Sequence, residues 1–354
     1  MKNVKEKFQD KVRGALIGGA VGDALGYPVE FIGSFYSIAY KYGEGGIRDY
    51  EFSIPSFDTS SKEALISDDT QMTLYTAEGL LEALKRGESF VGTIRDAYLA
   101  WYGGQERKQV EISYSSRLSE IPELNRHRAP GTTCLSALAS IFRGNEPCND
   151  SKGCGGIMRV SPIGIFGAVR KREKEETARL AGEVAEVTHL HPLSTYSSAA
   201  MAVLIQLCLS DADVPTLDSF KEKLAESMLT VETVYGSDAP FMGEFKSIVK
   251  KAGILSELSL TDWELIEEYL GGGWVAEETF AIALFSVLRH FNDVDGCLRC
   301  AVNHGGDSDS TGAVAGNIIG AVHGYEAIPK KFKVKLQFHD LLLSFADALV
   351  ESNK

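Results

Sequence analysis

The segment NHGGDSDSTGAVAG, which begins at Asn303, concentrates carboxylates and hydroxyls immediately before a run of small apolar residues. A surface turn does not need so many oxygen atoms, whereas a hard divalent cation does, because carboxylates and hydroxyls are its preferred ligands. A second segment, ISDDTQMTLYTAEGL, has the same arrangement of a hydroxyl and two carboxylates before a predicted helix. If the two segments face each other, they supply enough carboxylates for a pair of divalent cations.

The second segment also has a purely structural interpretation. Ser67 is a favourable N-cap, and Asp68 and Asp69 fall in the first helical turn, where the helix dipole favours negative charge. Taken alone, capping explains this segment better than metal binding does. The recurrence in GGDSDST favours a metal site, because two facing acidic clusters repel each other unless cations lie between them.

A glycine-rich loop, SKGCGGIMRVSPIG, begins at Ser151. Such a turn before a helix presents backbone N–H groups to an anion, and Arg159 would add a guanidinium donor. The loop matches neither GxGxxG nor GxxxxGK[ST]. A simple turn at the start of a helix therefore explains it equally well when it is considered alone.

The elements that must position these segments are predicted to be helices. Five segments are rich in Ala, Leu, Glu and Lys with apolar residues three or four apart: Lys62 to Arg86, Glu173 to His189, Pro192 to Leu209, Glu277 to Phe291 and Lys330 to Glu351. Strand patterns are nearly absent, and loops are predicted at 43–46, 53–61, 144–156 and 271–273. Without a linker or a repeat, the sequence predicts one all-α domain over residues 1–354.

Two of the predicted helical segments carry glycine at every fourth residue: Gly14, Gly18, Gly22 and Gly26, and Gly312, Gly316, Gly320 and Gly324. Glycine costs up to about 1 kcal/mol in a helix interior relative to alanine, so its repetition on one face indicates close backbone approach. Tight packing in a crowded helical core would explain either stripe alone. However, both adjoin acidic residues, Asp23 and Glu30 beside the first and Asp307 and Asp309 beside the second.

Composition restricts the partners and the cellular location. The 354 residues include 49 acidic and 36 basic ones, and the net charge of -13 argues against general binding to nucleic acid or anionic membranes. The sequence shows no secretory signal pattern, and we expect no apolar run to reach the length that spans a bilayer. Six scattered cysteines indicate reduced thiols, so a cytoplasmic location is the default expectation. Cys297 and Cys300 form a CxxC motif without a second pair or a histidine cluster, which favours a buried helical pair over zinc.

Taken together, these motifs resemble the ADP-ribosylglycohydrolases, also called the dinitrogenase reductase-activating glycohydrolase family. The matching segments follow the family's order from Gly14 to Gly324: GALIGGAVGDALGYPVEF, SDDTQMTLYTAEGL, GCGGIMRVSPIG, THLHP and HGGDSDSTGAVAGNIIGAVHG. The resemblance implies a compact all-α fold with a two-metal cleft holding Mg or Mn. It also implies hydrolysis of the glycosidic bond between ADP-ribose and an acceptor on a protein or a small molecule.

The resemblance assigns site residues by position. The metal ligands would be Ser67, Asp68, Asp69, Asp307, Asp309 and Ser310, the last often threonine in the family. Glu30 would be the acid/base group, with Asp69 and Asp309 completing the catalytic set. The substrate would contact Gly131 and Thr132 in RAPGTTC, the loop residues Gly153, Cys154, Gly155, Gly156 and Met158, and His189.

Several of these residues also have structural explanations. Glu30 could be a solvated residue at a helix end, and His189 could interact with a helix dipole. We expect His191, His304 and the other histidines to be structural, since oxygen-rich sites do not need imidazole, and Trp274 to be a core anchor rather than a stacking platform.

Two classes of function follow from the resemblance. The first is a metal-dependent ADP-ribosyl-acceptor hydrolase, with SDDT, GCGG and HGGDSDST closer to members that act on ADP-ribosyl-arginine than to those that act on ADP-ribosyl-serine. The second is a noncatalytic ADP-ribose-binding or transferase-neutralising protein. The intact acidic set of Glu30, Asp68, Asp69, Asp307 and Asp309 favours the first. A third reading, an all-α metal phosphohydrolase, lacks the His-Asp ligand pairs it would require.

Overall fold

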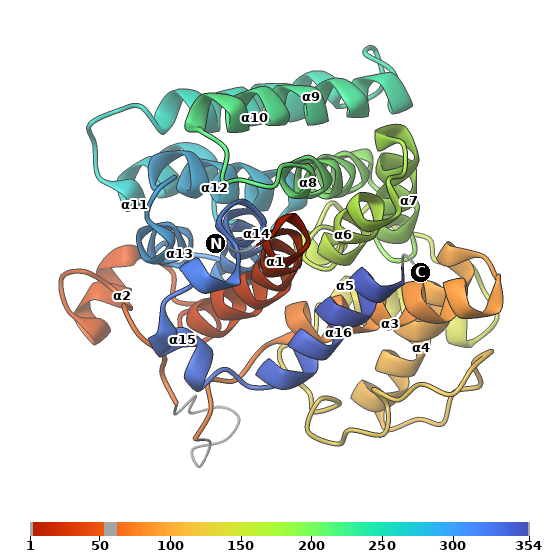
Figure 1. Cartoon of the computed structure of the whole chain (residues 1–354). Coiled ribbons are helices and arrows are strands. Elements are labelled where there is room, and N and C mark those ends of the chain that lie inside the picture. The colour runs from red at the N-terminus through yellow and green to blue at the C-terminus, as the bar shows by residue number, and fades with distance from the viewer. Residues whose placement is uncertain (1–2, 53–61, 353–354) are drawn as a thin grey trace.

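The computed structural model describes residues 3–52 and 62–352, and helices account for most of this part of the chain (Figure 1). The only β pairing among these residues is two isolated bridges, Ala64 with Leu336 and Gly153 with Val275. The predicted all-α fold is therefore confirmed. The α-helices are α1 (Val4–Gly26), α2 (Phe35–Tyr42), α3 (Asp68–Arg86), α4 (Phe90–Glu106), α5 (Thr132–Phe142), α6 (Ser161–Arg170), α7 (Lys174–Glu186), α8 (Pro192–Ser210), α9 (Leu217–Tyr235), α10 (Met242–Leu255), α11 (Asp262–Leu265), α12 (Ala276–Arg289), α13 (Val294–Val302), α14 (Ser308–His323), α15 (Lys330–Val334) and α16 (His339–Glu351).

Two predicted helix boundaries differ from the structure. The helix predicted from Lys62 begins only at Asp68, after the N-cap Ser67. The segment predicted as one helix to Glu351 is divided into α15 and α16. One interaction contributes to both differences: the N–H of Ala64 donates to the carbonyl oxygen of Lys335 at 2.7 Å, and its own carbonyl accepts from the N–H of Gln337 at 3.0 Å. The loop predicted at 53–61 lies outside the described residues.

The centre of the fold is the pair α1 and α14, which run antiparallel and lie side by side in Figure 1. Their glycine stripes face each other, since a Cβ atom at Gly18 would collide with the carbonyl oxygen of Gly316. Gly22 has the same relation to Gly312. No side chain larger than hydrogen fits at these contacts, and the prediction that both stripes lie in close-packed helix interfaces is confirmed.

Helix α8 is the most apolar long helix in the described part of the chain. Its 19 residues and mean hydropathy of 1.4 meet the length and composition of a membrane span, so the sequence-based statement that no apolar run is long enough was wrong. Yet 94% of the 18-residue apolar stretch of this helix is buried inside the protein, as in the core helix of a folded domain. A helix that is apolar on all sides is expected wherever other helices surround it.

The antiparallel pairing also determines where the polar segments meet. Gly26, at the end of α1, lies against the backbone of Ser308 at the start of α14. The residues that follow α1 and those that begin α14 are therefore at the same end of the pair. Helix α3 starts at that end as well, because its first N–H groups donate to Asp23 of α1.

Candidate active site

The start of α3 is held by a buried carboxylate of α1. Asp23 has no exposed surface and accepts hydrogen bonds from the backbone N–H of Ser67 at 2.9 Å and of Thr70 at 3.1 Å. Ser67 Oγ accepts from the N–H of Asp69 at 3.2 Å. Burial, followed by the charge of Asp309, raises the pKa of Asp23 to about 7. Asp23 and Ser67 thus accept the hydrogen bonds of N–H groups at the start of α3. The carboxylates of Asp68 and Asp69 are therefore not needed as helix caps and can bind a ligand.

The start of α14 is fixed in a different way. Its N-cap, Asp307, makes no side-chain capping bond, and its N–H donates to the carbonyl of Gly272 at 2.8 Å. The Asp307 carboxylate instead accepts from the thiol of Cys154 at 2.7 Å. Ser310 Oγ donates to Asp69 Oδ1 at 3.3 Å, which joins the starts of α14 and α3.

The two helix starts open into one cavity of about 280 Å³. It contains every predicted site residue except Ser67 and Gly156, and no lysine or arginine is among its described lining residues. The lining residues are Glu30, Phe31, Asp68, Asp69, Ala129, Pro130, Gly131, Thr132, Thr133, Cys134, Gly153, Cys154, Gly155, Met158, His189, Trp274, Asp307, Asp309 and Ser310.

Negative charge is crowded in this cavity. Burial and the charge of Asp309 raise the pKa of Asp68, Asp69 and Asp307 well above the usual range of aspartate. Carboxylate oxygens of Glu30, Asp307 and Asp309 lie within 4.8 Å of one another. Mutual repulsion of this kind requires either bound protons or cations.

Two buried oxygens in the cavity have no hydrogen-bond partner, Glu30 Oε2 and Asp69 Oδ2. A buried carboxylate oxygen without a partner is costly, and the donor set consists of the hard oxygen ligands that Mg²⁺ and Mn²⁺ prefer. The residues present therefore fit a divalent cation site. Glu30 lies in the turn after α1 with its Oε2 buried, so it is not a solvated residue at a helix end.

The glycine loop forms another part of the cavity wall, beside Asp307, and its residues Cys154–Gly156 form a short 3-10 turn. A Cβ atom at Gly155 would lie 2.7 Å from Cε1 of His189, so the loop can pack against the histidine only with glycine there. Burial, followed by the positive charge of Arg159, lowers the pKa of His189 to about 3. The lowered pKa favours a neutral imidazole over an imidazolium stabilised by a helix dipole.

Arg159 does not reach the cavity, contrary to the sequence-based interpretation. The side chain is fully buried, stacks over the ring of Tyr98 and donates to Thr188 Oγ1 at 2.6 Å. Thr188 Oγ1 is in turn 2.8 Å from Nδ1 of His189. The guanidinium therefore helps to position the histidine through Thr188 and does not bind an anion in the cavity.

Two predicted site residues lie outside the cavity lining. Ser67 is buried behind the cavity as a helix cap, and Gly156 packs against the side chains of Ser194 and Ala185.

Two aromatic residues that line the cavity, Phe31 and Trp274, were missed as site residues in the sequence. Trp274, expected to be a core anchor, is 44% exposed and stacks on Phe31 with ring centroids 5.5 Å apart. The three glycines before Trp274, which predicted a loop, are the sequence signal that could have indicated a surface position for this residue.

The comparisons with known proteins agree with this geometry. A model of the ADP-ribosylglycohydrolase family matches residues 4–354. An uncharacterized protein of Archaeoglobus fulgidus is 29% identical, covering 97% of each chain. ADP-ribosylarginine hydrolase Tri1 of Serratia proteamaculans is 26% identical, covering 96% of this chain and 79% of its own. ADP-ribosylhydrolase ARH3 of Bos taurus is 28% identical, covering 91% of this chain and 87% of its own.

A solved structure described as an ADP-ribosylglycohydrolase-related protein complex has the same fold. Its TM-score is 0.69 at 24% identity, covering 98% of this chain and 99% of that chain. The family match extends over nearly the entire sequence, including both acidic helix starts and the glycine loop. This protein therefore belongs to the ADP-ribosylglycohydrolase family and is a glycohydrolase enzyme.

Proposed function

We propose that this protein is a metal-dependent hydrolase that cleaves the glycosidic bond between ADP-ribose and an arginine side chain of a protein. The observation that carries the proposal is the set of carboxylates around one cavity without a lining lysine or arginine. Asp68, Asp69, Asp307 and Asp309 would hold two divalent cations, Mg²⁺ or Mn²⁺. Ser310 would add its hydroxyl, and Ser67 would contribute mainly by capping α3.

The chain's own residues suit cleavage at the anomeric carbon of a ribose. The cations, when bound, would orient ribose hydroxyls and acidify a water molecule. Glu30 would transfer the proton between water and the leaving group, because its Oε2 is buried without a partner and lies on the side of Asp307 and Asp309. Oxocarbenium character at the ribose would be stabilised by the surrounding carboxylates.

The glycine loop supports binding of the diphosphate. Gly153, Cys154 and Gly155 line the cavity beside Asp307, at a short helical turn where the lack of side chains on the glycines lets a ligand approach the backbone N–H groups. Met158 and neutral His189 add apolar and polar surface beside it. The anionic ligand would thus lie between the cations and the loop, which explains how a chain of net charge -13 could bind it.

The rim of the cavity supports arginine as the acceptor. Phe31 directly follows Glu30 and stacks on Trp274, so an aromatic pair flanks the group that would protonate the leaving atom. A planar guanidinium stacks favourably on aromatic faces, whereas a serine hydroxyl does not. The similarity to a relative named ADP-ribosylarginine hydrolase supports the same acceptor.

The test is release of free ADP-ribose from ADP-ribosylated arginine, serine and nucleobase substrates after chelation and after addition of Mg²⁺ or Mn²⁺. We expect cation-dependent release that is fastest from arginine. Trp274→Ala should lower kcat/KM for the arginine substrate more than for the serine substrate. Faster release from serine than from arginine would contradict the acceptor assignment.

The second candidate, a noncatalytic ADP-ribose-binding or transferase-neutralising protein, predicts a different result in the same assay. Such a protein would bind ADP-ribose by calorimetry but release none from any of the three substrates. We also propose a cytoplasmic location, supported by the six cysteines, all of which are unpaired.

A further inference from the structure

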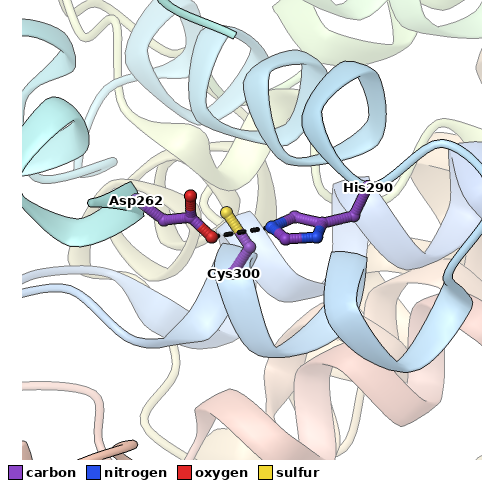
Figure 2. A group of neighbouring side chains, drawn as sticks. All are labelled: Asp262, His290 and Cys300. Carbon is purple, nitrogen blue, oxygen red and sulfur yellow. Dashed lines mark hydrogen bonds and ion pairs between the residues drawn. The ribbon is translucent and has the colours of Figure 1, made fainter. Parts of the chain in front are cut away.

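A second cluster of ligand-type side chains lies on α11–α13, outside the cavity described above. Asp262 begins α11, His290 directly follows α12 and Cys300 belongs to α13. Figure 2 shows the three side chains converging, with the sulfur of Cys300 beside the contact between Asp262 and His290. One ligand atom from each lies within 4.8 Å of the other two.

The carboxylate of Asp262 is oriented by a neighbour in the way that metal ligands usually are. Arg289 Nε donates to Asp262 Oδ1 at 3.0 Å, and the same guanidinium donates to the backbone carbonyl of Leu260 at 2.6 Å. The other oxygen, Oδ2, is 2.6 Å from Nε2 of His290. One carboxylate oxygen is thus used in positioning, and the second points toward the imidazole and the thiol.

The cluster is only partly buried. A surface pocket of about 420 Å³ is lined by Asp262, His290 and Cys300 together with residues of α13. The side chains of Asp262 and His290 are 30% and 27% exposed, whereas Cys300 is buried. A bound ion would therefore have three protein ligands and a fourth position facing the pocket, which is the pattern of an open tetrahedral site.

We propose that Asp262, His290 and Cys300 form a binding site for a borderline-soft divalent ion of the Zn²⁺ class, distinct from the oxygen-lined cavity. Thiolate and imidazole ligands select Zn²⁺ or Co²⁺ over Mg²⁺, Mn²⁺ and Ca²⁺. Binding displaces the thiol proton of Cys300, so the sulfur coordinates as thiolate, and Nε2 of His290 coordinates as neutral imidazole. Protons released by the ligands pass to solvent through the pocket.

This site changes the interpretation of the CxxC motif. The sequence argued against zinc because no histidine cluster accompanies Cys297 and Cys300, and Cys297 is indeed fully buried outside the cluster. The helices bring His290 and Asp262 to Cys300 instead. The ligand spacing is therefore not one of the short repeats by which zinc motifs are recognised in a sequence.

The test is titration of the intact protein with Co²⁺ in an excess of Mg²⁺, monitored by thiolate-to-metal charge-transfer absorption, followed by competition with Zn²⁺. We expect one equivalent of Co²⁺ with a thiolate signal that Zn²⁺ abolishes. Cys300→Ser should remove the signal and weaken Zn²⁺ binding by more than about 100-fold, because changes to neighbouring groups alone cost 10–100-fold. His290→Gln, a change at a partly exposed side chain, should weaken binding similarly.

Two matched controls separate this site from its alternatives. Cys297→Ser lies on the same helix outside the cluster and should leave Co²⁺ binding unchanged. Cys154→Ser removes the thiol that contacts Asp307 in the oxygen-lined cavity and should also leave the signal intact. The proposal would be overturned by absence of the signal in the unmodified protein, by its loss in Cys154→Ser, or by its retention in both Cys300→Ser and His290→Gln. The cluster would then be only an ion pair of Asp262 with Arg289 and a hydrogen-bonding contact of Asp262 with His290.

Discussion

The starts of α3 and α14 have similar sequences, SDDT and SDST, but the structure stabilises them differently. At α3, Asp23 and Ser67 accept the hydrogen bonds of the first N–H groups. At α14, the N-cap Asp307 makes no side-chain capping bond, and the helix is held by close packing of its glycines on α1. One terminus depends on polar side chains and the other on backbone contact.

The difference shows how acidic residues can be kept for a ligand at a helix start. Negative groups in the first turn are normally explained by capping and by the helix dipole. Here capping is provided by other groups at α3 and is absent at α14, so four aspartates face the cavity with repelling charges. Substitutions at the two termini should therefore have distinguishable effects.

The largest effect is expected for Asp309→Asn, because the charge of Asp309 acts on every other carboxylate of the site. An amide does not compete with water for a hard cation as an anion does. We expect loss of metal binding in calorimetry and a fall in ADP-ribose release of more than about 10⁴-fold, beyond the usual range of acid/base variants. Binding of two cations at undiminished affinity would show that Asp309 is not a ligand.

Glu30→Gln should have the next largest effect, on turnover alone. The amide retains the shape of the side chain but cannot transfer the proton, so the rate should fall by roughly 10²–10⁴-fold. Metal content and ADP-ribose affinity should stay unchanged in the same calorimetric titration. A wild-type single-turnover rate would exclude Glu30 as the acid/base group.

Gly316→Leu tests the backbone contact by which α14 is held against α1. The added side chain would collide with the carbonyl oxygen of Gly18, and overpacking of this kind costs about 1–3 kcal/mol or more. Gly253→Leu in α10 is the matched control, because nothing lies within 4 Å of a Cβ atom there and leucine favours a helix over glycine. Urea unfolding should show a loss for Gly316→Leu and none for Gly253→Leu; equal stabilities would refute the packing argument.

Ser67→Ala tests the terminus that depends on polar side chains. Loss of the cap should destabilise the protein by about 0.5–2 kcal/mol and also weaken metal binding, because Asp68 and Asp69 lose their fixed positions. Thr216→Ala removes the cap of α9, which accepts from the N–H of Ser219 and does not line the cavity. It should lower thermal stability while leaving metal binding intact. If both variants bind metal like wild type, capping at α3 does not position the ligands.

The smallest effect is expected for His189→Gln and depends on pH. Burial and Arg159 lower the pKa of His189 to about 3, so the folded protein does not bind the proton that the unfolded imidazole takes up below about pH 6.5. Stability therefore falls as the pH falls, by up to about 1.4 kcal/mol per pH unit from this group. His189→Gln should lose less stability than wild type between pH 7.5 and 5.5 in urea unfolding. Equal losses would contradict a neutral buried His189.

The sequence was informative where a residue type has one physical use. Repeated glycines on one helix face required backbone contact, and the structure shows that contact. It was misleading where the same side chain suits several environments. An arginine in an open loop can donate hydrogen bonds to an anion, but Arg159 is buried and packs on the ring of Tyr98. Trp274 is exposed at the cavity, although tryptophan usually anchors a core. Those outcomes depend on tertiary packing, which local patterns do not encode.

The pairing of α1 with α14 also has a consequence for synthesis of the chain. Asn317 donates to the carbonyl of Ala15, a partner 302 residues away in the sequence. All the residues between α1 and α14 must be synthesised before the glycine face of α1 can be covered. Closing so long a loop is entropically costly and slows folding. A nascent or truncated chain that ends before Ser308 would expose this apolar, side-chain-free face, where chaperones would be expected to bind.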